Sequence, residues 1–208
     1  MTGRIKLILA SASPRRRDLL AQIGITPDDI VGAAVDESPK RGERPRDLAV
    51  RLGRAKVEAA RDALKPGQDG ALVLAADTVV AVGRRILGQA GTSSDAERFL
   101  KLLSGRNHRV FTGLALVTRS GEVRIRCVES RVTFKRLSPD ELAAYLASGE
   151  WRGKAGGYAI QGKAGAFVTR LVGSYSNVVG LPLAETAALL EGEGYPVRSR
   201  WTEGANLG

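Results

Sequence analysis

The stretch LILASASPRRRDLLAQIG, residues 7–24, decides the fold because it runs from a buried strand directly into a helix. The apolar run over residues 5–10 predicts a strand. Ser13 is suited to the N-cap and Pro14 to the first helical position, which predicts a helix over residues 13–23. A strand followed at once by a helix is the opening unit of an α/β protein.

Three consecutive cations, Arg15, Arg16 and Arg17, fall at the start of this predicted helix. That end of a helix carries roughly half a positive charge and several unpaired N–H groups, so cations there are mildly unfavourable. An anionic ligand removes the conflict: a phosphate can be held by backbone N–H groups, the Ser13 hydroxyl and a guanidinium. The alternative is that the arginines are solvated surface groups.

Chain length and composition predict one globular domain, or two lobes that share one sheet, over residues 1–197, and the last residues, 198–208, are expected to form a flexible tail. With 208 residues, 43% of them hydrophobic, the chain can bury a substantial core. The apolar run before Asp77 is six residues long, far short of the roughly 20 that a membrane span needs. One cysteine excludes an intrachain disulfide, and the start of the chain does not resemble a signal peptide, so a cytoplasmic location is expected.

The charge balance favours an anionic partner. Lys and Arg total 32 against 22 Asp and Glu, a net charge of +10. Nucleotides, nucleic acids and acidic surfaces all fit this charge. Aromatic residues are 5% of the chain, and no helix-turn-helix or zinc pattern is present, so nucleic acid is not the expected partner.

The remaining pattern alternates helices and strands, which predicts an α/β class. The predicted helices are 45–64, 94–103 with an SDAE capping box, 138–149 and 181–194, and the predicted strands are 71–82, 110–118 and 123–137. Between Gly153 and Gly180 the chain is glycine-rich and is expected to be irregular. Long irregular stretches in compact domains are usually functional.

Asp77 is the second informative residue, because ALVLAADTVVAV places its carboxylate within an apolar strand. Burying it unpaired would cost several kcal/mol or raise its pKa. It therefore needs a cation, a metal or a place facing a cleft. A metal ligand and a general base are the functional candidates, and a structural aspartate is the alternative.

Any metal would be held by oxygen atoms. With one histidine, His108, and one cysteine, Cys127, a zinc site is nearly excluded, and His108 is expected to be a local hydrogen-bonding residue. Asp77, Glu37 and Glu129, together with substrate phosphates, favour Mg²⁺ or Mn²⁺.

GYAIQGKA, residues 157–164, has the GxxxxGK spacing of a Walker A loop but lacks the Ser or Thr that binds Mg²⁺. The sequence AGAFVTRLVG that follows predicts a strand in place of the helix that such a loop needs. We therefore do not interpret it as a P-loop.

Four ordered motifs resemble the Maf, or septum-formation, family of nucleoside triphosphate pyrophosphatases, and specifically its dTTP/UTP branch. They are LASASPRR, AADTVV, FTGLALV and GGYAIQGKAGAFV with GSYSNVVGLPL, and they span residues 7 to about 190. The resemblance implies an elongated mixed sheet flanked by helices, with two lobes and a central cleft. It also implies metal-dependent hydrolysis of a nucleoside triphosphate to the monophosphate and pyrophosphate, and it allows a homodimer.

The resemblance also implies roles for individual residues. Asp77 matches the active-site acid and Glu37 the second acidic position, and both are expected to bind the metal. The positions expected to bind substrate are Ser13, Arg15, Arg16, Lys56, Thr78 and Gln161. Of these, Arg15, Thr78 and Gln161 match positions linked to substrate choice.

Two questions stay open. A 7-methyl-GTP or broad modified-nucleotide pyrophosphatase is the alternative enzyme, and a non-enzymatic cell-division regulator that binds nucleic acid or an acidic partner is the alternative of another class. The chain also departs from the family pattern at Gln89, where a lysine is typical. Arg84 or Arg85 is a candidate to replace that charge.

Overall fold

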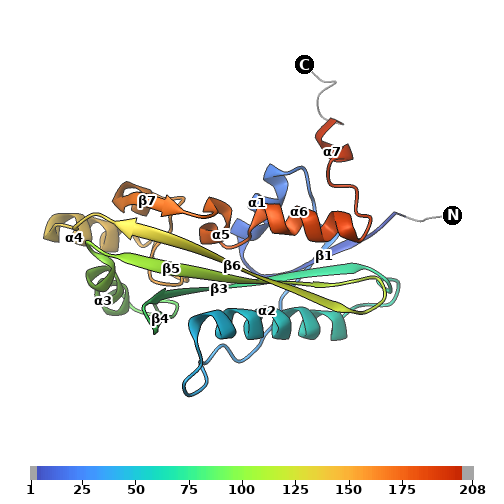
Figure 1. Cartoon of the computed structure of the whole chain (residues 1–208), viewed down its shortest axis with the longest axis horizontal. Coiled ribbons are helices and arrows are strands. Elements are labelled where there is room, and N and C mark those ends of the chain that lie inside the picture. Colours follow the sequence, from blue (N-terminus) through green and yellow to red (C-terminus); the bar gives the residue numbers. More distant parts are fainter. Residues whose placement is uncertain (1–3, 203–208) are drawn as a thin grey trace.

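The computed structural model describes residues 4–202 as an elongated α/β fold built on one twisted sheet (Figure 1). Within these residues the sheet has seven strands in the order β2-β1-β3-β5-β6-β7, with β4 paired to β3. The strands are β1 Leu7–Ala10, β2 Asp29–Val31, β3 Leu72–Val82, β4 Arg85–Leu87, β5 Asn107–Val117, β6 Val123–Phe134 and β7 Val168–Val172. The helices are α1 Pro14–Gln22, α2 Pro45–Asp62, α3 Ser93–Leu103, α4 Pro139–Ser148, α5 Tyr175–Val179, α6 Leu183–Gly192 and α7 Ser199–Thr202, with a 3₁₀ turn, η1, at Lys163–Phe167.

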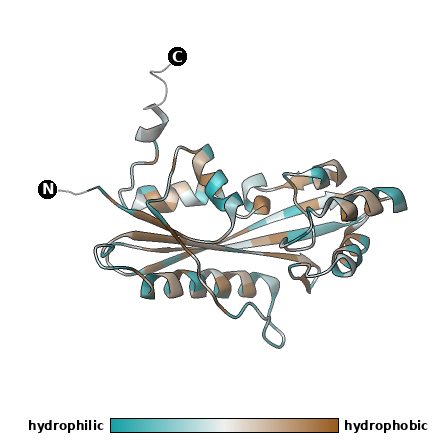
Figure 2. Cartoon of the chain, turned by 180° about the vertical axis from the view of Figure 1, so that it is seen from behind, coloured by the Kyte–Doolittle hydropathy of each residue, from teal (hydrophilic) through white to brown (hydrophobic). Residues whose placement is uncertain are grey.

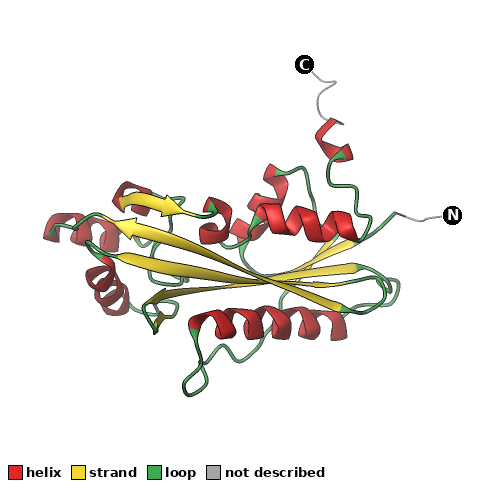
Figure 3. Cartoon of the chain, in the orientation of Figure 1, coloured by secondary structure: helices red, strands yellow, loops and turns green. Residues whose placement is uncertain are grey.

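The sheet is mixed. β1 runs parallel to β2 and β3, whereas β3, β5 and β6 form a long antiparallel meander. Helix α2 covers one face and helices α1, α5 and α6 lie on the other (Figure 3). The strands are most hydrophobic over the part of the sheet between α2 and α6 (Figure 2), as expected for strands buried on both faces.

The predicted elements are present, with two differences. Helix α4, predicted over residues 138–149, begins with a capping box, in which the Ser138 and Glu141 side chains each bond the other residue's backbone N–H. In α3 the box lies two residues earlier than predicted, because Thr92 and Asp95 form it in place of Ser94 and Glu97. The stretch predicted to be irregular contains three short elements, η1, β7 and α5. Glycines with positive φ make the sharp turns in this stretch.

The described core has four buried clusters, and two of them lie at opposite ends of the long strands, in the parts of the fold called lobes below. One buried cluster lies around α3 and α4 and includes Leu100, Phe134 and Tyr158. Another lies around β1, α1 and α6 and includes Leu9 and Leu74. The long strands β3 and β5 pass through both lobes.

Helix α2 lies unusually close to the sheet because glycines meet at the contact. A Cβ at Gly53 would overlap the Gly113 carbonyl, and a Cβ at Gly113 would overlap the Ala49 carbonyl. Gly113 pairs directly with Asp77 across β5 and β3. The close approach therefore brings the next turn of α2, which carries Lys56, over Asp77.

The edge of β3 has a gap that positions the site. Residues 72–75 of β3 pair with β1, and residues 80–82 pair with β4. In the described part of the chain, residues 76–79 have a strand partner only on the β5 side. Side chains of neighbouring strand residues point to opposite faces, so Asp77 and Thr78 can both be reached from this gap.

The described end of the chain, residues 198–202, lies in the predicted tail. Helix α7 lies within 198–202, the Trp201 indole donates to the Ile23 carbonyl at 2.9 Å, and Arg198 pairs with Glu191 at 2.6 Å. Residues 203–208 of that prediction lie outside the described residues. Within residues 4–202, no helix has the length and apolar character needed to cross a bilayer.

Candidate active site

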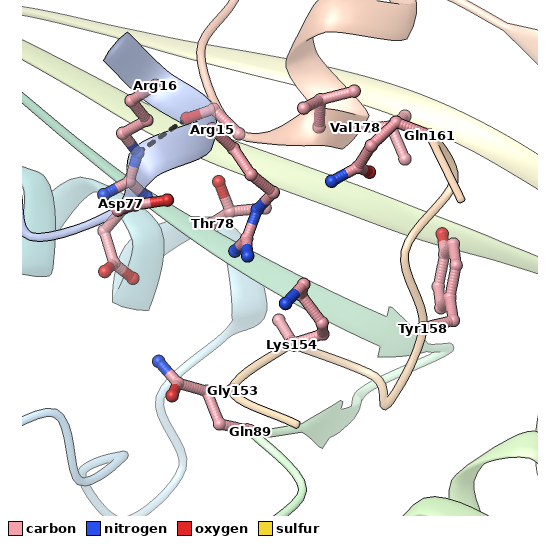
Figure 4. A pocket seen from close by; sticks show the side chains of 14 residues that line it. Arg15, Arg16, Asp77, Thr78, Gln89, Gly153, Lys154, Tyr158, Gln161 and Val178 are labelled. Atoms are coloured by element: carbon pink, nitrogen blue, oxygen red, sulfur yellow. Dashed lines mark hydrogen bonds between the residues drawn. The ribbon is translucent and has the colours of Figure 1, made fainter. Parts of the chain in front are cut away.

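A cleft lies at the gap in the β3 edge. Its first part, on the Thr78 face of the sheet, is lined by Ser13, Arg15, Arg16, Asp77, Thr78, Gln89, Gly153, Lys154, Ala155, Tyr158, Gln161, Val178, Val179 and Gly180 (Figure 4). Its second part reaches the α2 face, is more apolar, and shares Asp77, Thr78, Gln89 and Ala155 with the first. Six of the eight predicted site residues line the first part. Glu37 lines the second, and Lys56 contacts both acids.

Asp77 has the cationic partner that its burial requires. It is 6% exposed, and its carboxylate is bonded by the Lys56 ammonium, which also pairs with Glu37 at 2.6 Å. Burial raises the pKa of Asp77 above its ordinary value, and Lys56 and Arg16 oppose that rise. The result is a basic carboxylate held at the floor of the cleft.

Glu37 comes from the loop between β2 and α2, and Arg51 of α2 holds that loop. The Arg51 guanidinium donates to both carboxylate oxygens of Glu43, at 2.7 and 2.9 Å, and to the Ser38 carbonyl at 2.9 Å. The hydrogen bonds from Arg51 lower the pKa of Glu43 to about 2. This bidentate pair fixes the chain on the C-terminal side of Glu37.

The start of α1 presents its cations as predicted. Arg16 donates to the Ser11 hydroxyl and to the Gly180 carbonyl, both at 2.9 Å, so its guanidinium is fixed between two segments. Arg15 has no hydrogen-bond or ion-pair partner within residues 4–202 and extends into the cleft (Figure 4). Burial lowers the pKa of both arginines. An anionic ligand would satisfy them.

Ser13 is the N-cap of α1, but within the described residues its side chain makes no capping hydrogen bond. Its hydroxyl therefore stays available to a ligand in the cleft, which it lines. The prediction that Ser13 is the N-cap is confirmed, although its side chain does not make the usual capping hydrogen bond in the described structure.

Gln161 lines the first part of the cleft, whereas Thr78 lines both parts. Gln161 lies at the far end beside Tyr158 and Val178 (Figure 4). The Tyr158 hydroxyl is fixed by His108 Nε2 at 2.8 Å. Burial lowers the pKa of His108 to about 4, so this histidine is the neutral hydrogen-bonding residue that the sequence predicted.

Lys154 is a cleft residue that sequence reasoning missed. It extends beside Arg15 into the same space, opposite Gln89 (Figure 4). Burial lowers its pKa, and the charge of Arg15 adds to that effect. The bridge between Gln89 and Ala155 holds the two segments together. The only signal in the sequence was a lysine at the start of the glycine-rich stretch.

Four other residues that the sequence analysis raised lie outside the cleft. Arg84 and Glu129 line a separate groove on the α2 side, where Glu129 pairs with Arg109 at 3.3 Å. Arg84 therefore does not replace the charge missing at Gln89, and Arg85 does not line the cleft. Lys163 of the GxxxxGK stretch pairs with Glu150 at 2.6 Å, and a 3₁₀ turn and β7 follow it, so the stretch is not a P-loop.

The donor set of the cleft limits which metals fit. Within residues 4–202, no group of three or more His, Cys, Asp or Glu side chains could hold a metal ion. Asp77 and Glu37 are nevertheless both bonded to one ammonium, so their carboxylates lie close together. Two carboxylates suit Mg²⁺ or Mn²⁺ when substrate phosphates and water complete the shell.

The fold and the cleft define an α/β protein suited to a phosphorylated ligand, because cations and a buried carboxylate meet at one gap in the sheet. The chain belongs to the Maf-like protein family, whose sequence profile matches residues 6–193. It is similar to a dTTP/UTP pyrophosphatase of Nitrobacter hamburgensis, with 60% identity over 203 residues covering 97% of this chain and 98% of the relative. It is also similar to one of Mesorhizobium japonicum, with 60% identity over 198 residues covering 94% and 95%.

Among solved structures, the chain overlaps a nucleoside-triphosphatase, or dITP/XTP pyrophosphatase, of Mycobacterium abscessus. The TM-score is 0.38 at 19% identity, and the overlap covers 64% of this chain and 74% of the other.

Proposed function

We propose that this protein hydrolyses dTTP and UTP to the nucleoside monophosphate and pyrophosphate. The observation that carries the proposal is the buried, basic Asp77 beside Lys56 and Glu37, reached through a cleft lined by cations. The relatives named dTTP/UTP pyrophosphatase, about 60% identical over nearly the whole chain, supply the substrate class.

The substrate lies across the gap in the β3 edge. The nucleoside occupies the Thr78 face, near Gln161, whose amide can pair with a donor–acceptor edge of uracil or thymine. The α-phosphate lies beside Asp77, and the triphosphate extends along the cations Arg15, Arg16 and Lys154. These cations neutralise charge that would otherwise repel the two carboxylates.

Asp77 is the proton acceptor. A water oxygen attacks the α-phosphorus in line with the bond to the bridging oxygen of the pyrophosphate. The water proton passes to Asp77, the α-phosphorus–oxygen bond breaks, and pyrophosphate leaves with the bonding electrons. Arg15, Arg16 and Lys154 stabilise the charge on the transferred and leaving phosphates, and positioning supplies most of the rate gain.

Asp77 and Glu37 would hold Mg²⁺ or Mn²⁺ once a substrate enters, with Lys56 retained as their common cation. The ion, when bound, would supply Lewis-acid polarisation of the phosphate oxygens. Removal of divalent ions with EDTA is expected to abolish turnover, and Mg²⁺ or Mn²⁺ to restore it. The proposal also includes a cytoplasmic location, a nucleotide as the ligand in place of nucleic acid, and a homodimer.

The test is product analysis with wild-type protein and Asp77→Asn on UTP, dTTP, 7-methyl-GTP and modified pyrimidine triphosphates. Wild type is expected to form monophosphate and pyrophosphate from UTP and dTTP. Asp77→Asn is expected to lose at least about 1,000-fold in kcat, because a neutral amide cannot accept the proton. Asp69→Asn, an exposed loop residue, is the matched control.

Each contrary outcome identifies what fails. Release of orthophosphate would contradict attack at the α-phosphorus, and preference for 7-methyl-GTP would favour the other branch. Full activity of Asp77→Asn would contradict the assigned acid. If wild type turns over no nucleotide and binds polyanions in a salt-sensitive manner, the cell-division regulator becomes the better interpretation.

A further inference from the structure

A buried chain of hydroxyl and amide groups lies directly behind Thr78. Thr78 Oγ1 and Thr112 Oγ1 are 2.9 Å apart, and the two residues are direct partners across β3 and β5. Thr112 Oγ1 also donates to the backbone carbonyl of Asn177, at 3.1 Å. Thr112 and Asn177 are 0% exposed, so water does not compete for these bonds.

The direction of the Thr78 hydrogen bond follows from counting protons. A threonine hydroxyl has one hydrogen and two acceptor lone pairs. The Asn177 carbonyl can only accept, so Thr112 gives its single hydrogen to that carbonyl. Thr78 must therefore be the donor in its bond to Thr112. The hydroxyl hydrogen of Thr78 is used in its bond to Thr112. Toward the cleft, the Thr78 oxygen can therefore only accept a hydrogen bond.

The far end of this chain of bonds is fixed in the same way. The Ser130 hydroxyl donates to the Ser174 carbonyl at 3.1 Å, so it can only accept from Asn177 Nδ2, at 2.9 Å. Asn177 Nδ2 also lies 3.3 Å from the Val110 carbonyl. These bonds hold α5 in place, and with it the Asn177 carbonyl that orients Thr112.

Arg16, the cation near Thr78, makes its hydrogen bonds to other groups and leaves the Thr78 oxygen free to accept one. Arg16 donates from Nε to the Gly180 carbonyl and from Nη1 to the Ser11 hydroxyl. Among the residues that the structure describes, Thr112 is the hydrogen-bond partner of Thr78 Oγ1. The hydroxyl thus presents a lone pair to whatever occupies the nucleoside side of the cleft.

We infer that Thr112 and the Asn177 carbonyl make Thr78 an acceptor-only contact that selects a hydrogen-bond donor on the nucleoside. This inference rests on the proposed function. The donor is either the N3–H of uracil or thymine or the 3′-hydroxyl of the sugar. Thr112 is a positioning residue, since it acts on the substrate through Thr78.

The experiment compares kcat/KM for UTP, 3-methyl-UTP, which lacks the N3–H, and 3′-deoxy-UTP, which lacks the sugar hydroxyl. Wild type is expected to lose about tenfold or more on one of the two analogues, because the Thr78 lone pair then faces no donor. In Thr112→Val, the freed Thr78 hydroxyl can rotate and donate, so that loss should shrink to less than about threefold. Thr112→Ser keeps the hydroxyl and should behave as wild type.

The analogue that is rejected identifies the source of the donor. A steric clash of the 3-methyl group would persist in Thr112→Val, which separates it from a lost hydrogen bond. In a Thr78→Val background, the Thr112→Val change should no longer alter the selectivity. Because Thr112 is buried, circular dichroism of each variant accompanies the kinetics, and Thr78→Val alone provides a second test at a partly exposed position.

Equal activity of wild type on all three substrates would overturn the inference, as would selectivity that Thr112→Val and Thr78→Val both leave unchanged. Absence of UTP hydrolysis by wild type would instead contradict the proposed function. The two failures are therefore distinguishable.

Discussion

Asp77 combines two opposing influences on one carboxylate. Burial in an apolar strand raises its pKa, whereas the Lys56 ammonium stabilises the ionised form. A general base must be ionised before it can accept a proton, so activity should fall as the pH drops through the raised pKa of Asp77. The Asp77 carboxylate is thus more basic than that of an exposed aspartate.

Removing the Lys56 charge should shift the pH at which activity falls on the acid side. In Lys56→Met the carboxylate loses its main stabilising cation, so the pKa of Asp77 rises further and the fall in kcat/KM shifts to higher pH. The pH profile of kcat/KM, which reports the free enzyme, checks this prediction. The substrate ionises in the same way with both proteins, so a difference between the two pH profiles reports on the protein. Lys101→Met, on the exposed face of α3, is the control. A pH profile of Lys56→Met that falls at the same pH as that of wild type would contradict the prediction.

Lys154 gives a second prediction at the scale of single residues. Its ammonium lies in the cleft where Gln89 brings no charge, so Lys154→Gln should raise KM for UTP about tenfold or more. Introducing Gln89→Lys into that variant should recover part of the loss. Lys163→Gln breaks a surface pair outside the cleft lining and should leave KM near wild type. Steady-state kinetics at fixed ionic strength provide the measurement.

At the scale of elements, the contact between α2 and β5 sets the position of Lys56 over Asp77. Glycines at 53 and 113 allow the helix backbone to touch the strand backbone. Helix α2 could be predicted from its apolar periodicity. The contact between α2 and β5 could not be predicted, because the sequence around Gly113 does not show which helix packs against it.

Gly113→Ala should therefore affect both stability and activity. The new methyl group would overlap the Ala49 carbonyl and force α2 outward, at a cost of about 3 kcal/mol. Thermal melting and kcat/KM should both decrease, because Lys56 moves away from Asp77. Gly32→Ala is the control, because a Cβ there meets no atom within 4 Å. Equal melting temperatures in the two variants would contradict this account.

At the scale of the whole molecule, the long strands β3 and β5 contribute to all four buried clusters of the described residues. Two of these clusters lie at opposite ends of the strands, one near α3 and α4 and the other near α1 and α6. Strands that are continuous through both clusters couple the lobes mechanically. The cleft lies between them, where β1 has ended and β4 has not yet begun.

This continuity predicts one cooperative unfolding transition for the predicted single domain. Phe134→Leu in the first cluster and Leu74→Ala in the second should each lower the same transition, the latter by about 2–5 kcal/mol. Differential scanning calorimetry of both variants checks this. Two separate transitions, each sensitive to one variant, would instead show that the lobes unfold independently.

The sequence by itself determined the order of the long strands and the main helices, the cationic helix start and the carboxylate of Asp77 within an apolar strand, because these depend on local periodicity, capping and the cost of burying charge. It did not show the short elements β2, β4, α5 and α7. It indicated Glu37, Lys56, Thr78 and Gln161 only through resemblance to a family. The tertiary structure alone decided that Lys154 faces Gln89, that Lys56 bonds both acids, and that Thr112 orients the Thr78 hydroxyl. Each of these depends on strand register and on the close approach of α2, which join residues far apart in the chain and leave no local pattern.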